Sequence, residues 1–189
     1  ATFRYRKGKF RSIIGGNYGR SDGHRRDSRF QQYTGFAKLG YDFNRSWKLT
    51  ADVDLTHFDA SNPGEIQQPL IDNDQKITRG MTSLALAHRN KYMNGALRGY
   101  INWGHHQVND GYHKGEKPKN SLYHHDDRMI GVSVYETFAF FQGQRFTFGG
   151  DWMQFGGKAW NKALSDGKKN IIVDKTENEF AAYADSQQR

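Results

Sequence analysis

Histidine is concentrated in one part of the chain, beside two aspartates. Five of the 8 histidines lie between positions 105 and 125. Imidazole and carboxylate groups together suit Zn, Cu, Ni or Fe ions, and a haem iron takes a single imidazole. This long connecting segment is therefore a candidate capture site for a metal or haem. The alternative is that these histidines have no ligand and lie at solvent-exposed strand ends. No compact zinc-binding spacing such as His-Glu-x-x-His is present. The candidate ligands are His105, His106, His113, His124, His125, Asp126 and Asp127.

The sequence contains no arrangement of residues that indicates catalysis. Gly156-Gly157-Lys158 is followed by Ala159 rather than Ser or Thr, and the first Gly of a phosphate loop is missing. No Ser-His-Asp arrangement is visible. The chain has no Cys, which excludes disulfides and Cys-ligated metal centres. We predict a protein that is not an enzyme and has no resident cofactor.

The segment from Trp47 to Thr56 alternates strictly between apolar and polar residues. Side chains alternate faces along a strand, so this segment has one wholly apolar face and one charged face. A soluble sheet covers such an apolar face with a core, whereas a membrane barrel turns it to lipid and turns the charged face to a wet lumen.

The same periodicity identifies about nine strands and no sustained helical pattern. The predicted fold class is all-β: an antiparallel up-and-down meander that forms part of a transmembrane β-barrel. The expected strands are residues 1–6, 10–19, 29–43, 47–58, 79–89, 95–106, 122–140, 145–155 and 171–184.

The predicted connections alternate between short and long. In a meander, this alternation puts every short turn at one end of the sheet and every long loop at the other, as in outer-membrane barrels. Pairing Phe43 with Trp47 across one short turn places Tyr41 opposite Leu49. The short connections are residues 7–9, 44–46, 91–94 and 141–144, and the long ones are residues 20–28, 59–78, 107–121 and 156–170.

Aromatic residues are expected in two belts, as membrane interfaces select. The alternative is that these rings fill a soluble core. The belt near the short turns comprises Phe43, Trp47, Tyr92, Phe138, Phe140, Phe141 and Phe146, and the belt near the long loops comprises Phe58, Trp103, Trp152 and Phe155.

Composition favours a β protein with one wet face. Only 35% of the residues are hydrophobic and the mean hydropathy is −0.92, yet 14% are aromatic; disordered chains are poor in aromatics. No stretch approaches the ~20 apolar residues of a membrane helix. The net charge of +8 raises the possibility of nucleic-acid binding, but Lys and Arg are spread along turns and strand ends.

Several segments together resemble the barrel hairpins of TonB-dependent outer-membrane receptors. The resemblance covers nearly the whole chain and rests on the order and spacing of motifs that are each weak alone. The motifs are Gly15-Gly-Asn-Tyr-Gly-Arg-Ser-Asp-Gly-His-Arg-Arg-Asp-Ser28, Tyr33-Thr-Gly-Phe-Ala-Lys-Leu-Gly-Tyr41, Trp47–Thr56 with Asn62-Pro-Gly64, Gly149-Gly-Asp-Trp152 and Glu177-Asn-Glu-Phe-Ala-Ala-Tyr183.

The resemblance implies a barrel of roughly 22 strands with an N-terminal plug inside it, located in the outer membrane of a Gram-negative bacterium. Residues 1–189 are expected to be an interior part of that barrel domain. Such a receptor imports a scarce nutrient, and the expected substrate here is an iron complex (siderophore or haem) or another metal complex such as cobalamin. Its implied partners are outer-membrane lipid and lipopolysaccharide, the plug of the parent chain, the TonB energising complex and the metal-complex ligand, but no nucleic acid.

Two alternatives stay open at this point: a soluble basic β protein that binds nucleic acid, and a plain porin or adhesin barrel. One continuous apolar band on a curved sheet would exclude the first, whereas packing against a second sheet would exclude the membrane. The residues expected to face lipid are Trp47, Leu49, Ala51, Val53, Leu55, Leu97, Ile101, Val132, Val134, Phe146 and Phe148. Those expected to face the lumen are Lys38, Asp42, Lys48, Asp52, Asp54 and Arg98.

Overall fold

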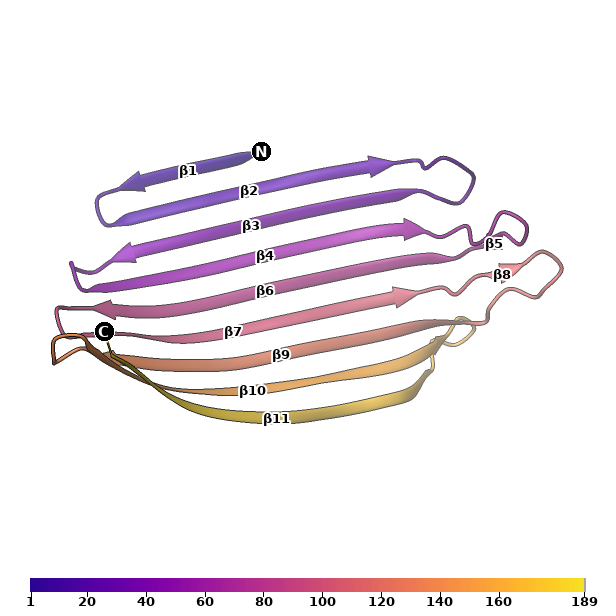
Figure 1. Cartoon of the computed structure of the whole chain (residues 1–189). Coiled ribbons are helices and arrows are strands. Elements are labelled where there is room, and N and C mark those ends of the chain that lie inside the picture. The colour runs from indigo at the N-terminus through magenta and orange to yellow at the C-terminus, as the bar shows by residue number, and fades with distance from the viewer. Residues whose placement is uncertain (189) are drawn as a thin grey trace.

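A computed structural model describes residues 1–188 of the chain as an antiparallel sheet of nine strands, with a separate two-stranded sheet in the loops (Figure 1). Within the large sheet, each strand pairs with the strand that precedes it and the strand that follows it in that sheet along the chain; the two short strands pair only with each other. The strands are β1 (Thr2–Lys7), β2 (Phe10–Ser21), β3 (Phe30–Asp42), β4 (Trp47–Ser61), β5 (Leu70–Ile71), β6 (Asp74–Arg89), β7 (Met93–Val108), β8 (Tyr112–His113), β9 (Ser121–Phe138), β10 (Gln144–Ala163) and β11 (Lys169–Gln188).

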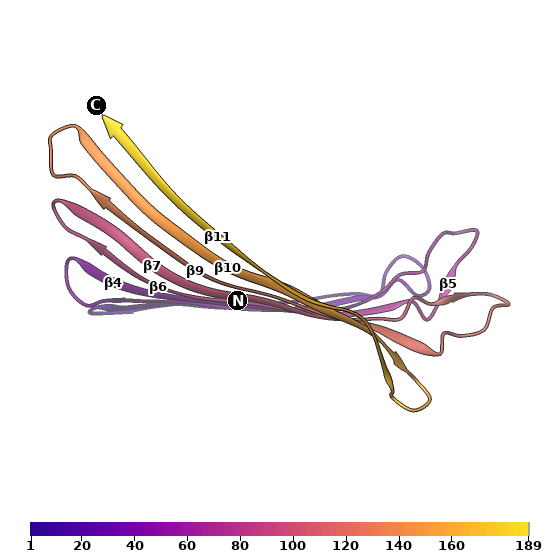
Figure 2. The same cartoon turned by 90° about the horizontal axis from the view of Figure 1, so that it is seen from below.

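The predicted all-β meander is confirmed. The backbone N–H of Phe43 donates to the Trp47 carbonyl across the 44–46 turn, and Tyr41 pairs with Leu49 as the sequence predicts. The sheet is twisted and curved (Figure 2). It does not close on itself, because β1 and β11 form its two edges.

One predicted long loop is wrong. Residues 156–163 continue β10 and residues 169–170 begin β11, so only residues 164–168 connect the two strands. The polar, glycine-containing sequence is typical of a loop, but Lys158 pairs with Asp174 and their side chains form an ion pair of 3.0 Å. The other three connections at this end are longer, and β5 pairs with β8 between two of them. We call this end of the sheet the loop end and the opposite end the turn end.

The strand register separates two faces, because directly paired residues on neighbouring strands share a face. One row runs Leu49, Leu86, Leu97 and Val134 from β4 to β9. We call the face that carries this row the apolar face, and the opposite face the polar face. All the residues expected to face lipid lie on the apolar face, and all those expected to face the lumen lie on the polar face. Whether these faces meet lipid and lumen stays a prediction.

Nothing in residues 1–188 covers the apolar face. Each strand contacts only its ladder neighbours, and the only buried apolar residues described are Ala159 and Trp160. Large side chains such as Leu84 and Phe148 remain 53% and 52% exposed. The described residues also contain no helix of the length and apolar character needed to cross a membrane.

The loop-end aromatic belt differs from the predicted one. Phe58 and Phe155 lie on the polar face, because Phe58 pairs with Gln32 and Phe155 pairs with Met129. Trp152 pairs with Val132 well inside the sheet, since β10 is longer than expected.

Trp103 of the predicted belt and two tyrosines outside it border the apolar face at the loop end. Trp103 lies there between Gly80 and Arg128, and Tyr18 and Tyr33 contact each other with ring centroids 5.0 Å apart. Beyond them the same face becomes polar, where His105 pairs with Asp126.

One polar pair interrupts the apolar face near the turn end. His88 Nε2 donates to Glu136 Oε2 over 2.7 Å, and the two side chains are 16% and 29% exposed. They reach each other across Gly95, where an added Cβ would lie 2.4 Å from Glu136 Oε2. Trp47 packs on the His88 ring.

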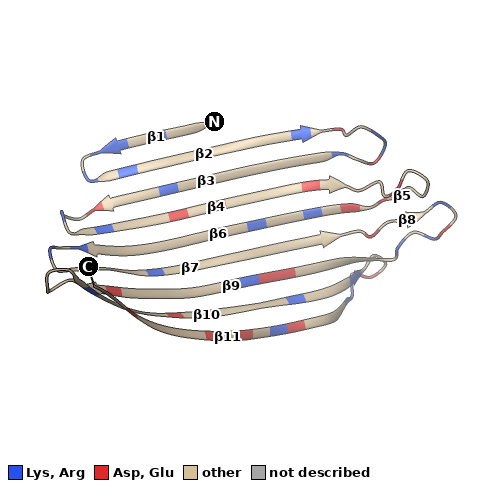
Figure 3. Ribbon diagram, viewed as in Figure 1, with Lys and Arg blue, Asp and Glu red and all other residues tan. Residues whose placement is uncertain are grey.

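Charge on the polar face is mixed in sign. Ser83 donates to Asp52 and accepts from Arg98, while Arg11 pairs with Asp42 at 3.1 Å. Lys, Arg, Asp and Glu recur along the strands and turns (Figure 3). Four basic residues lie together on the polar face of β1 to β3 and line one pocket with Asp52: Arg4, Arg6, Arg11 and Lys38.

Candidate functional site

The side chains of the histidine-rich segment lie on both faces of the sheet. His106 pairs with His125 and lies on the polar face, whereas His105 pairs with Asp126 and lies on the apolar face. His113 lies apart on β8, where its Nδ1 is 3.3 Å from the Pro69 carbonyl oxygen. The expected single cluster is thus two separate groups.

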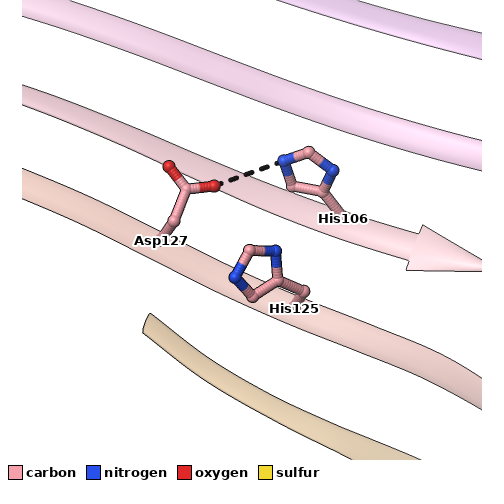
Figure 4. Close-up of side chains that lie close together, drawn as sticks. All are labelled: His106, His125 and Asp127. Atoms are coloured by element: carbon pink, nitrogen blue, oxygen red, sulfur yellow. Dashed lines mark ion pairs between the residues drawn. The ribbon is translucent and has the colours of Figure 1, made fainter. Parts of the chain in front are cut away.

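The polar-face group consists of His106 on β7 with His125 and Asp127 on β9 (Figure 4). One ligand atom from each residue lies within 4.8 Å of the others, and His106 Nε2 is 3.3 Å from Asp127 Oδ1. Residues i and i+2 share a strand face, so the register alone brings Asp127 beside the two paired rings. Among residues 1–188, this is the one group of three such side chains at metal-binding separation.

Arg79 on β6 completes the group, and sequence analysis missed it. Its Nη2 donates to Asp127 Oδ2 over 2.9 Å, while its Nη1 lies 3.3 Å from Asp127 Oδ1 and 3.0 Å from His106 Nε2. Arginine only donates, so Nε2 of His106 is the acceptor and the proton of the neutral ring is on Nδ1. The sequence carries no local signal for this contact, because it depends on the pairing of three strands.

Two glycines leave room around the Asp127 carboxylate. Gly104 on β7 and Gly157 on β10 are its direct partners on either side. A Cβ at Gly104 would lie 2.5 Å from Asp127 Oδ1, and one at Gly157 would lie 3.1 Å from His125 Nε2. Side chains from β6, β7 and β9 can meet at Asp127 because neither flanking position carries one.

A cavity of about 740 Å³ adjoins the group on the polar face. This volume is in the range of pockets for small-molecule ligands. Its walls combine apolar, amide and charged groups, and it includes His125 and Asp127. Other lining residues are Asp54, Arg79, Met81, Asn102, Tyr123, Met129, Phe155, Lys175 and Glu177.

Burial lowers the pKa of His106 from its ordinary value, and the Asp127 carboxylate opposes this shift only in part. Burial likewise lowers the pKa of His124. Both residues lie on the loop side of the Trp103 row, outside the apolar part of the sheet. A depressed pKa keeps an imidazole neutral near pH 7, with a nitrogen lone pair available to a metal or to a donor.

The apolar-face group has a different character. His105 Nδ1 contacts Asp126 Oδ1 at 2.5 Å, and His124 stacks on Trp160 with 5.3 Å between ring centroids. Neither ring nitrogen of His124 has a hydrogen-bond partner among the described residues. Lys169 lies over the other ring of this stack, 4.9 Å from the Trp160 centroid. Within residues 1–188, His105, His124 and Asp126 do not form a group at metal-binding separation.

The comparisons with known proteins give no family. No protein-family model matches the sequence, and the search of curated proteins finds no match.

Proposed function

We propose that this chain is part of the β-barrel of a TonB-dependent receptor in a Gram-negative outer membrane. The receptor imports a scarce nutrient, an iron complex such as a siderophore or haem, or another metal complex such as cobalamin. It works with outer-membrane lipid and lipopolysaccharide, the plug of its parent chain and the TonB energising complex. Its role is transport and not catalysis.

The uncovered apolar face is the observation that carries this proposal. On β4 the apolar stretch runs from Trp47 to Leu55, which is about 26 Å along the strand at ~3.3 Å per residue. A strand tilt of ~35–45° reduces this to roughly 20 Å, close to the ~25 Å apolar band of outer-membrane barrels. Such a band would aggregate in water, whereas lipid covers it without any second sheet.

The position of charges and rings argues against the nucleic-acid alternative. Binding of single strands needs aromatic rings for stacking and basic groups for phosphates in one groove. Here Lys38 and Arg98 lie on the polar face, while exposed rings such as Tyr41 and Phe148 lie on the apolar face. A flat strand of nucleic acid cannot contact both faces of one sheet.

The choice between a receptor and a porin is tested by energy dependence. Cells that produce the full-length protein are grown under iron limitation, and uptake of radiolabelled iron complexes is measured with and without a functional TonB complex. We expect uptake that disappears when either the protein or the complex is removed. Uptake that persists without the TonB complex would contradict the receptor, and recovery of the protein in the soluble fraction would contradict the membrane assignment.

A further inference from the structure

We propose that His106, His125 and Asp127 bind one divalent transition-metal ion, of which Zn²⁺ is the representative, on the polar face of the sheet. Ion binding by these side chains stands on their geometry alone. Only the identification of the ion as cargo, either free or carried in a complex, rests on the proposed import function.

The donor set suits this class of ion. Two imidazoles and one carboxylate are typical ligands of Zn²⁺ and of other late first-row divalent ions, and they leave further positions for water or a ligand. Ligand atoms ~2.1 Å from a tetrahedral ion lie about 3.4 Å from one another. His106 Nε2 and Asp127 Oδ1 are already 3.3 Å apart. The three ligand atoms lie within 4.8 Å, so a change of rotamer at His125 is the main adjustment.

Arg79 marks the place where a cation fits. One of its nitrogens, Nη1, lies within 3.3 Å of both His106 Nε2 and Asp127 Oδ1. Two acceptors thus converge on a single positively charged group, as they would on a metal ion. An entering ion replaces Nη1 at these two atoms, while the 2.9 Å contact from Nη2 to Asp127 Oδ2 can persist and orient the carboxylate.

The surroundings leave the position open to a solute. Gly104 and Gly157 flank Asp127 without side chains, and the 740 Å³ cavity reaches His125 and Asp127. The side chain of Arg79 is 51% exposed, so it can move aside without breaking a packed core. An ion pair between Arg79 and Asp127 alone would need neither imidazole nor the two glycines.

The test measures metal binding to the purified full-length protein in detergent. Zn²⁺ is titrated in competition with a chromogenic chelator, and Co²⁺ absorption reports the coordination of the ion. The variants are His106→Ala, His125→Ala and Asp127→Asn. Each removes a ligand, so each is expected to weaken Zn²⁺ binding by more than the ~10–100-fold typical of groups that only orient ligands.

The opposite face supplies matched controls. His105→Ala and Asp126→Asn change the same residue types one position away, on side chains that point to the apolar face. We expect them to leave Zn²⁺ affinity within about twofold, inside the scatter of substitutions away from a site. The electrophoretic shift of the unheated barrel verifies that every variant is folded.

The two proposals fail in different ways. Absence of Zn²⁺ binding by the unaltered protein, or an equal loss in the control variants, would overturn the metal site. Energised uptake of a metal complex would still support import in that case. Zn²⁺ binding that depends on the three ligands supports the site, even if uptake proves independent of the TonB complex and import is refuted.

Discussion

Leu84 lies at the centre of the apolar face, paired with Ala51 on β4 and Gly99 on β7. Its side chain is 53% exposed in the protein alone, so an arginine can replace it without a clash in the sheet. If this face contacts lipid, Leu84→Arg places a charge near the middle of the hydrocarbon layer.

The expected cost depends on depth. Arginine near the bilayer midplane destabilises an outer-membrane barrel by about 2–4 kcal/mol, and near the interface by about 0–1 kcal/mol. The first value corresponds to a roughly 30- to 800-fold change in the folding equilibrium. Thr78→Arg, on the same face and strand but on the loop side of Trp103, is expected to fall in the lower range.

A second control tests the face instead of the depth. Met81 is on the same strand but on the polar face, where it pairs with Asp54. Met81→Arg therefore stays in water beside an opposite charge, and we expect a change within about 0.5 kcal/mol. The measurement is the free energy of unfolding of the full-length protein in phospholipid vesicles, by denaturant titration. An equal cost for Leu84→Arg and Met81→Arg would refute the assignment of the apolar face to lipid.

Two glycines leave room for polar side chains of the neighbouring strands: Gly95 lies between His88 and Glu136, and Gly104 lies beside Asp127. His88→Leu leaves the Glu136 carboxylate without a partner on the apolar face and should lower the free energy of unfolding by about 3 kcal/mol. The double variant His88→Leu/Glu136→Leu should recover most of this loss. A double variant as unstable as the single one would contradict coupling between the two residues. Gly104→Ala pushes a methyl group against Asp127 Oδ1 and should weaken Zn²⁺ binding at least ~10-fold. Gly99→Ala, with no atom within 4 Å of its added Cβ, should leave binding unchanged, and an equal effect of both would argue against a site at Asp127.

The fold was predictable where one face of a strand is wholly apolar. The alternation in Trp47–Thr56 fixes both the strand and its two faces, and the short turn at residues 44–46 fixes the register with β3. Prediction failed where apolar and polar residues do not alternate along a strand. At the loop end, apolar and polar residues do not alternate around Lys158. The sequence of this segment alone therefore could not predict that β10 continues to Ala163; its pairing with β11 shows it.

The candidate site was predictable in composition and not in geometry. A displacement of one residue in the pairing of β7 with β9 moves every side chain to the opposite face, and a loop as long as residues 109–120 does not set that register. Alternation along each strand already separates His105 from His106 and His124 from His125, but only the register decides which side chains of β7 meet which side chains of β9. Arg79 comes from a third strand, and its approach depends on the missing side chain at Gly104.

The most direct test of the account is a nitroxide scan along β4 of the full-length protein in lipid bilayers. This chain has no Cys, so within it single cysteines introduced at positions 49 to 53 are the only labelled sites. We predict that labels replacing Leu49, Ala51 and Val53 are accessible to oxygen and shielded from a water-soluble nickel chelate, and that labels replacing Thr50 and Asp52 show the reverse. Accessibility without this two-residue alternation, or with the opposite phase, would contradict a lipid-facing apolar face and a wet polar face.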